Sequence, residues 1–143
     1  MTQVVVVGSV ALDSIETPYG HENDILGGSA TFFSISASYF CDVGLVGVVG
    51  TDFPPESLDI FHRRKIDLSG FQKAEGNTFR WSGYYSDDLN TAHTRDTQLN
   101  VFAQFAPVLP EHYKSTPYLF LGNIDPELQL AVMEQIDRPQ FIA

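Results

Sequence analysis

Two stretches near the start of the chain hold residues that could bind a small molecule. Asp13 follows an apolar run that ends in Gly8-Ser9, and a carboxylate at the end of a strand can accept charge-assisted hydrogen bonds from ligand hydroxyls. Gly27 and Gly28 precede an apolar segment, and glycines at a helix start let a ligand approach unpaired backbone N–H groups. Taken alone, Asp13 would fit a loop acid bonded to its local backbone, and the glycines would fit a tight turn into a helix.

The charge distribution indicates which ligands these two stretches could hold. The chain of 143 residues carries a net charge of −10, which argues against non-specific nucleic-acid binding and against attraction to anionic membranes. The first 50 residues contain five acidic side chains and no Lys or Arg. We therefore expect a neutral or hydroxyl-rich ligand at the glycine pair, unless an arginine from later in the chain reaches it.

The composition is that of one globular domain in a reducing compartment. Hydrophobic residues make up 43% of the chain and charged residues 18%, which is ordinary for a folded domain. Cys41 is the only cysteine, so no internal disulfide can form. No basic segment precedes the first apolar run, and no apolar run approaches membrane-spanning length. These features predict a cytoplasmic protein.

Hydrophobic periodicity predicts an alternation of buried strands and helices, as in a parallel α/β sheet. The predicted strands are 3–8, 43–49 and 118–121, and the predicted helices are 28–40, 56–65 and 127–136. A further strand begins at Phe141 and predicts an exposed apolar edge. The chain therefore resembles the first part of a larger α/β domain.

Two segments interrupt this alternation. Ser9–Glu16 alternates between its two faces and could pair with Ile25-Leu26 as a ribbon that stands off the main sheet. From Ser69 onward, short strands predict an antiparallel meander, followed by an ordered loop at 96–106. The strands of this meander are 71–73, 78–85 and 91–95.

Three motifs, in this order and spacing, resemble the N-terminal half of the ribokinase-like PfkB family of carbohydrate and nucleoside kinases. They are Val4-Val5-Val6-Val7-Gly8-Ser9 with Asp13, then Gly27-Gly28-Ser29-Ala30, then Val46-Gly47-Val48-Val49-Gly50-Thr51-Asp52. Two weaker stretches, Thr78-Phe79-Arg80-Trp81 and Leu121-Gly122-Asn123, also resemble family sequence. The resemblance covers essentially the whole chain but only half of the family's usual domain.

The resemblance implies a central, mostly parallel sheet with helices on both faces and a small antiparallel lid. Residues 1–143 would form the N-terminal part of one domain, with lid strands at about 12–26 and 70–96. The C-terminal, ATP-binding part of the family's domain would be absent. In the family such a lid closes over the substrate and often forms a homodimer contact.

The resemblance also implies an activity. Members of the family use ATP and Mg²⁺ to phosphorylate a hydroxyl of sugars, nucleosides and related small molecules, so the chain would be the substrate-binding half of a carbohydrate-type kinase. By the same resemblance Asp13 would bind acceptor hydroxyls and Gly27 and Gly28 would contact the acceptor, whereas Asp52 would have a positional role. Phe32 stands where the family commonly has a substrate-binding Asn, which argues against a simple sugar such as ribose unless Phe32 is a core residue.

Arg80 and Asn123 complete the expected substrate-binding set. Arg80 and Arg95 are the arginines of the predicted meander, and either could hold an anionic group or lie on a solvated strand face. Trp81 could stack on a ligand ring or could belong to the apolar face of the lid.

The residues needed for phosphoryl transfer itself are missing. The family's Gly-Ala-Gly-Asp motif, which supplies a base and an anion-holding helix start, does not occur, and neither does a Walker-type motif. The four histidines lack metal-ligand spacing. The chain alone is expected to be inactive and not to bind ATP or Mg²⁺ tightly. The alternatives are a Rossmann-type nucleotide-binding domain of an oxidoreductase, although G-x-G-x-x-G is absent, and a non-catalytic binding or dimerisation module.

Overall fold

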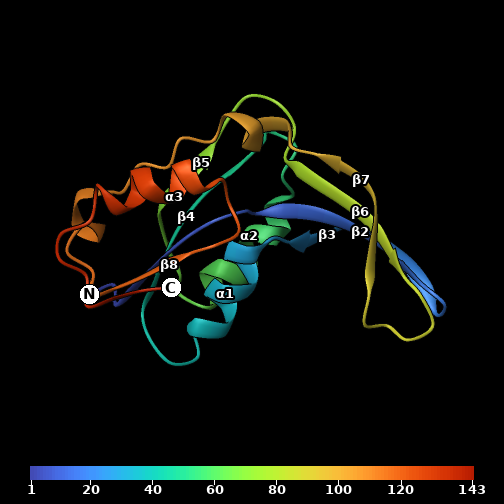
Figure 1. Ribbon diagram of the computed structural model, residues 1–143, viewed down its shortest axis with the longest axis horizontal. Coiled ribbons are helices and arrows are strands. Elements are labelled where there is room, and N and C mark those ends of the chain that lie inside the picture. Colours follow the sequence, from blue (N-terminus) through green and yellow to red (C-terminus); the bar gives the residue numbers. More distant parts are fainter.

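The computed structural model describes residues 1–143, which form two β-sheets and three α-helices (Figure 1). The strands are β1 (Val4–Val7), β2 (Ala11–Thr17), β3 (Gly20–Gly27), β4 (Val43–Val49), β5 (Asp67–Lys73), β6 (Phe79–Tyr85), β7 (Ala92–Gln98), β8 (Tyr118–Leu121) and β9 (Phe141–Ile142). The helices are α1 (Ser29–Ala37), α2 (Pro55–Arg63) and α3 (Pro126–Met133), with 3₁₀ helices η1 (Asn100–Gln104) and η2 (Glu111–Tyr113). None of the α-helices combines the length and apolar character that a membrane span requires.

The central sheet has the order β5-β4-β1-β8-β9, and all of its strand pairs are parallel. Its middle strands β1 and β4 are buried along their whole length. Both are rich in valine, and the β-branched side chains pack well on a pleated surface that is covered on both sides. The predicted strands at 3–8, 43–49, 118–121 and Phe141 are confirmed.

Helices cover both faces of this sheet, as expected. On one face, α1 and α2 pack Ala30 and Phe61 against Val6 and Leu45. On the other, α3 and the 3₁₀ helices pack Val132 and other apolar residues against the opposite side chains of β1 and β4. Figure 1 shows α3 and α1 on opposite sides of the central strands.

The second sheet, which we call the lid sheet, has the order β3-β2-β6-β7 and projects from the central layers (Figure 1). Its outer pairs β2–β3 and β6–β7 are antiparallel, but its middle pair β2–β6 is parallel. The lid is therefore mixed rather than purely antiparallel, because two hairpins from different parts of the chain join side by side.

The predicted meander is wrong in its first strand. Residues 71–73 belong to β5, which pairs in parallel with β4 at the edge of the central sheet. The strand contains several polar residues because it is an edge strand, so its pattern resembles that of a lid strand. Gly70 allows β5 to approach Val46 closely, since a Cβ at this position would lie within 2.7 Å of the valine side chain.

Two smaller boundaries also differ from expectation. The predicted helix 28–40 ends earlier than expected, at Ala37, and Phe40 beyond it is 89% exposed. The segment predicted as an ordered loop continues β7 as far as Gln98 and then forms η1, where Phe102 stacks on Phe79 with ring centroids 5.3 Å apart. This stacking connects the end of the lid sheet to the central domain.

An apolar groove of about 280 Å³ lies between the end of α1 and the edge strand β9. Every side chain that lines it is apolar, and two of its phenylalanines, Phe40 and Phe141, are exposed by 89% and 62%. A concentrated apolar surface of this kind binds hydrophobic probes and partner surfaces.

We expect this groove to bind a hydrophobic fluorescent dye such as anilinonaphthalene sulfonate in the folded chain. Phe40→Ser together with Phe141→Ser should lower the dye fluorescence by at least about twofold, because the two rings form much of the exposed apolar surface. Tyr19→Ser is the matched control, since Tyr19 is 85% exposed at the tip of the lid sheet. Equal dye binding by the wild type and the double variant would contradict the assignment of the groove.

Candidate functional site

A cleft of about 510 Å³ lies where the lid sheet meets the ends of the central strands and the start of α1. Parallel strands bring their carboxyl ends to one edge of a sheet, which is the usual ligand-binding edge of open α/β folds. The lining residues are Ser9, Ala11, Asp13, Gly28, Ser29, Phe32, Phe79, Trp81, Phe120, Leu121, Gly122 and Asn123. No Lys or Arg is among them.

Asp13 faces this cleft from β2 and is partly buried. Burial raises the pKa of its carboxyl above the ordinary value, and no hydrogen bond or nearby cation offsets that effect. A carboxylate without a partner in a partly buried position is costly. The Asp13 side chain is therefore available to a ligand that donates hydrogen bonds.

Gly27 makes room for the Asp13 side chain. A Cβ on Gly27 would overlap the Asp13 carboxylate, so a larger residue at position 27 would displace the acid. The structure thus places Gly27 directly against Asp13, behind the surface that lines the cleft.

Gly28 lets the start of α1 approach the loop after β1. Its φ of 100° favours glycine, and a Cβ would overlap the carbonyl of Ser9. Ser9 then satisfies the first helical N–H groups: its Oγ accepts from Ser29 N at 3.0 Å, and its carbonyl accepts from Ala30 N at 3.0 Å. Two of the backbone donors expected to be open to a ligand at this helix start are therefore bonded within the protein.

Aromatic side chains form much of the remaining wall. Phe32 is 60% exposed on the cleft side of α1, so it is not a core residue. Phe79 and Trp81 come from β6, and Phe120 from β8 stacks on Phe33 with ring centroids 3.7 Å apart. These rings give the cleft large apolar faces in addition to the Asp13 carboxylate.

Trp81 is held in one orientation by its neighbours. Its indole N–H donates to Thr94 Oγ1 at 3.1 Å. A Cβ on Gly83 would overlap the indole ring, so glycine at this position allows the ring to lie close to the strand. The indole is therefore a fixed surface at the lid side of the cleft.

The structure brings together four of the six residues predicted to bind substrate: Asp13, Gly28, Phe32 and Asn123 all line the cleft. Gly27 lies behind Asp13, and Arg80 does not line the cleft. Sequence reasoning did not single out Phe79, Phe120, Ser9 or Ser29 as site residues. The alternation of a strand could have identified Phe79. Phe79 and Trp81 flank Arg80, so both point to the face of the strand opposite to that of Arg80.

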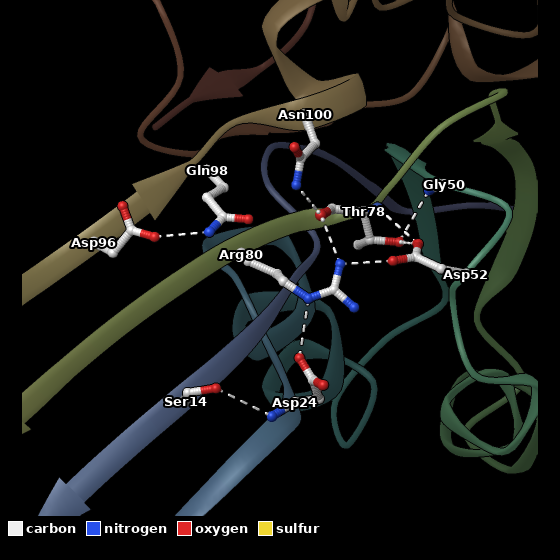
Figure 2. Close-up of polar contacts among 9 residues, drawn as sticks. All are labelled: Ser14, Asp24, Gly50, Asp52, Thr78, Arg80, Asp96, Gln98 and Asn100. Carbon is white, nitrogen blue, oxygen red and sulfur yellow. Dashed lines mark hydrogen bonds and ion pairs between the residues drawn. The ribbon is translucent and has the colours of Figure 1, made fainter.

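Arg80 lies on the other face of β6, where two acidic residues hold it (Figure 2). Hydrogen bonding to Asp52 and then to Asp24 raises the pKa of the guanidinium. Burial alone would raise the pKa of Asp52, but the hydrogen bonds from Arg80 and Thr78 outweigh burial and hold that pKa below its ordinary value. Arg95 pairs instead with Glu16 within the lid sheet. The positional role expected for Asp52 agrees with these contacts.

No group of three or more His, Cys, Asp or Glu residues is arranged so that it could hold a metal ion. The cleft also presents no cationic side chain that could neutralise phosphate groups. The lining of the cleft thus combines the Asp13 carboxylate and the Asn123 amide with several aromatic rings.

Comparison with known proteins agrees with the expected fold. No family model matches the sequence. The cytidine kinase of Thermococcus kodakarensis is 30% identical over 138 residues, which cover 95% of this chain and 49% of that protein. The chain therefore spans about half the length of the curated relative that it matches.

Solved structures show the same relationship. The nucleoside kinase of Methanocaldococcus jannaschii, described as an archaeal member of the ribokinase family, matches 99% of this chain and 51% of its own length with a TM-score of 0.74 and 17% identity. Ribokinase from Cryptococcus neoformans, solved in complex with ADP, matches 94% of this chain and 45% of its own length with a TM-score of 0.72 and 16% identity. The chain therefore resembles the N-terminal part of ribokinase-like kinases in fold, and about half of the cytidine kinase in sequence.

Proposed function

We propose that this chain is the acceptor-binding half of an ATP-dependent phosphotransferase and that its acceptor is a nucleoside. The observation that carries the proposal is the pairing, in one cleft, of an Asp13 carboxylate without a protein partner and a wall of aromatic rings. A nucleoside has the matching groups, since its ribose donates hydrogen bonds and its base has two flat apolar faces.

Asp13 supports the hydroxyl part of this proposal. Its two carboxylate oxygens can accept from two hydroxyls on adjacent carbons, and charge-assisted hydrogen bonds are stronger than neutral ones. Its raised pKa reflects burial without compensation, so a bound diol would supply the hydrogen bonds that the protein does not. Asn123, in the loop after β8, lines the same cleft and offers a further amide donor and acceptor.

The aromatic rings of the cleft support the proposal that the acceptor carries a nucleobase. Stacking of a nucleobase on an aromatic side chain contributes about 1–3 kcal/mol. Phe32 and Trp81 approach the cleft from α1 and from the lid sheet respectively, and Trp81 is held in orientation by Thr94. A plain sugar would leave these rings without a flat partner, whereas a nucleobase could stack on them.

The charge of the cleft supports a nucleoside rather than a nucleotide. No Lys or Arg lines it, and the Asp13 carboxylate would repel a phosphate group. The names of two relatives agree with this choice, since they are a cytidine kinase and a nucleoside kinase. We therefore propose a neutral nucleoside as the acceptor. We also propose that the residues of this cleft do not bind the phosphoryl donor.

We propose that these residues bind the acceptor and do not themselves transfer phosphate, since the cleft lining contains no Lys or Arg that could hold the phosphates of ATP. In ribokinase-like kinases, ATP with Mg²⁺ supplies the phosphoryl group. The roles left to this chain are to bind the acceptor, to orient its hydroxyls at Asp13 and to exclude water with the lid sheet.

We expect cytidine to bind the chain at least about tenfold more tightly than ribose, because stacking of the base adds to the hydroxyl contacts. Cytidine monophosphate should bind more weakly than cytidine, because its phosphate meets an acidic cleft. Saturation-transfer NMR and quenching of the fluorescence of Trp81, the single tryptophan, measure all three affinities.

Ribose that binds as tightly as cytidine would contradict the nucleoside proposal and favour a sugar acceptor. Tight binding of NAD in an isothermal titration would contradict the kinase assignment as a whole and favour a Rossmann-type nucleotide-binding domain.

Asp13→Asn should weaken cytidine binding by at least about tenfold, because a charged acceptor contributes about 1.5–3 kcal/mol per hydrogen-bonded contact. Asp42→Asn is the matched control, because Asp42 contacts only the chain's own N-terminus among charged groups and its side chain is 77% exposed. Unchanged cytidine affinity in Asp13→Asn, with normal affinity in the control, would remove Asp13 from the site.

A further inference from the structure

The lid sheet is attached to the central domain where the chain enters β6. Asp52, in the loop after β4, accepts hydrogen bonds from both the backbone N–H and the hydroxyl of Thr78, each at 2.7 Å. The Thr78 hydroxyl also accepts from Gly50 N at 3.0 Å, and Thr51 N donates to the Gly76 carbonyl at 2.9 Å. Thr78 is completely buried, so the hydroxyl at the centre of this attachment is shielded from water.

Arg80 extends the attachment to a second part of the lid sheet (Figure 2). Its Nη1 donates to Asp52 Oδ2 at 2.6 Å, and its Nε donates to Asp24 Oδ1 at 3.0 Å. Asp52 belongs to the central domain and Asp24 belongs to β3, so one guanidinium bridges two segments that are far apart in the sequence. The side chains of Arg80 and Asp52 are only 29% and 26% exposed, whereas that of Asp24 is 54% exposed.

The bridge lies directly behind the aromatic wall of the cleft. Phe79 and Trp81 flank Arg80 in β6 and face the cleft, because successive side chains of a strand point to opposite sides. Trp81 lies opposite Asp13 in the register of β6 with β2, and Arg80 lies opposite Leu12. Any shift of β6 relative to the central domain therefore moves the two rings relative to Phe32 and Asn123.

A guanidinium suits this position better than an ammonium would. Arginine presents several N–H donors in a rigid plane, so two carboxylates can be bound at once from different directions, whereas lysine presents a single point charge. Arg95 and Glu16 form a contrasting pair, because both belong to the lid sheet and their ion pair reaches no part of the central domain.

We propose that Arg80 is a positioning residue that locks the lid sheet to the central domain through Asp52 and Asp24 and so fixes the aromatic wall of the acceptor cleft. The consequence for nucleoside binding depends on the function proposed above. The locking itself does not, since it is a property of the chain without any ligand.

Arg80→Gln tests the lock in the ligand-free chain, with Arg95→Gln as the control of equal charge change. We expect amide hydrogen exchange in β2, β3 and β6 to accelerate by at least about tenfold in Arg80→Gln, while exchange in β1 and β4 stays as in the wild type. Acrylamide should also quench the fluorescence of Trp81 more strongly. Arg95 also lies over the ring of Tyr84 near the outer end of β6, so Arg95→Gln should affect at most that end of the strand and should leave Trp81 close to the wild type.

Equal acceleration in the lid strands and in β1 and β4 would overturn the proposal, because it would show that Arg80 stabilises the whole fold. So would unchanged exchange in all of these strands. If Arg80→Gln does not fold, Asp24→Asn decides the question, since it keeps the pair with Asp52 and replaces the charged bridge to β3 by a weaker, neutral hydrogen bond. Faster exchange limited to β2 and β3 is then expected, and unchanged exchange there would overturn the bridge.

Cytidine binding tests the second claim, that the lock fixes the aromatic wall of the cleft. In Arg80→Gln the dissociation constant for cytidine should rise by about tenfold, and Arg95→Gln should bind as the wild type does. If the wild type binds no cytidine, the proposed function fails while the exchange experiment still decides the lock. If Arg80→Gln loosens the lid sheet without changing cytidine affinity, the lock is retained and its role in positioning the rings is overturned.

The lock should also respond to pH through Asp52, whose facing charged groups are Arg80 of β6 and, beyond it, Asp24 of β3. Its folded-state pKa lies below the ordinary value of 3.8. The contribution of a carboxylate of this kind is complete above its ordinary pKa and is lost as the pH falls through the lowered one. The difference in Trp81 quenching between the wild type and Asp52→Asn should therefore stay constant from pH 7 to about pH 5 and shrink only below about pH 4. A difference that disappears already between about pH 6 and pH 5 would contradict the role of the Asp52 carboxylate.

Discussion

The close approach of three chain segments at Ser9 is the constraint on which the arrangement of the cleft depends. The loop after β1, the start of α1 and the end of β8 meet there, and glycine occupies the contact point of each segment. A Cβ on Gly28 would overlap the Ser9 carbonyl, and a Cβ on Gly122 would crowd the Ser29 hydroxyl. Because Ser9 also bonds the first N–H groups of α1, the helix cannot move away without leaving buried donors unpaired. This junction brings Phe32, Asn123 and Asp13 to one cleft, although they come from α1, the loop after β8 and the lid sheet.

The charged side chains near the cleft lie on two sides of strand β6. The acceptor cleft has an acid without a partner and no base, while the guanidinium of Arg80 is directed to the opposite face of β6 and held by two carboxylates. An arginine in the cleft would have neutralised Asp13 and favoured an anionic ligand. Its placement behind the wall leaves the Asp13 carboxylate without a partner, as the proposed neutral acceptor requires. The same strand thus separates an electrostatic attachment on one face from an apolar binding surface on the other.

Local sequence patterns predicted much of the central sheet and little of how the lid sheet is assembled. The valine runs of β1 and β4 and the apolar faces of α2 and α3 have the periodicity of buried elements, and the structure confirms them. The parallel pairing of β2 with β6 joins segments more than sixty residues apart, and no local pattern encodes such a partner. Strand β5 was assigned to the lid because an edge strand and a lid strand have the same mixture of polar and apolar residues. The grouping of Asp13, Gly28, Phe32 and Asn123 came from the family resemblance, since spacing along the chain does not show which loops meet.

The same limit explains why Arg80 was expected at the ligand. Its motif predicts a strand, and a strand residue has two possible faces that local sequence distinguishes only when one of them is clearly apolar. Here both flanking residues are aromatic and the face that they share is the cleft, so the charged residue between them must point away from it. What the sequence did not show is that Asp24 and Asp52 would meet it there, because they lie 56 and 28 residues distant. An arginine that connects two such segments transmits the position of the central domain to the lid, and through the lid to the rings that line the cleft.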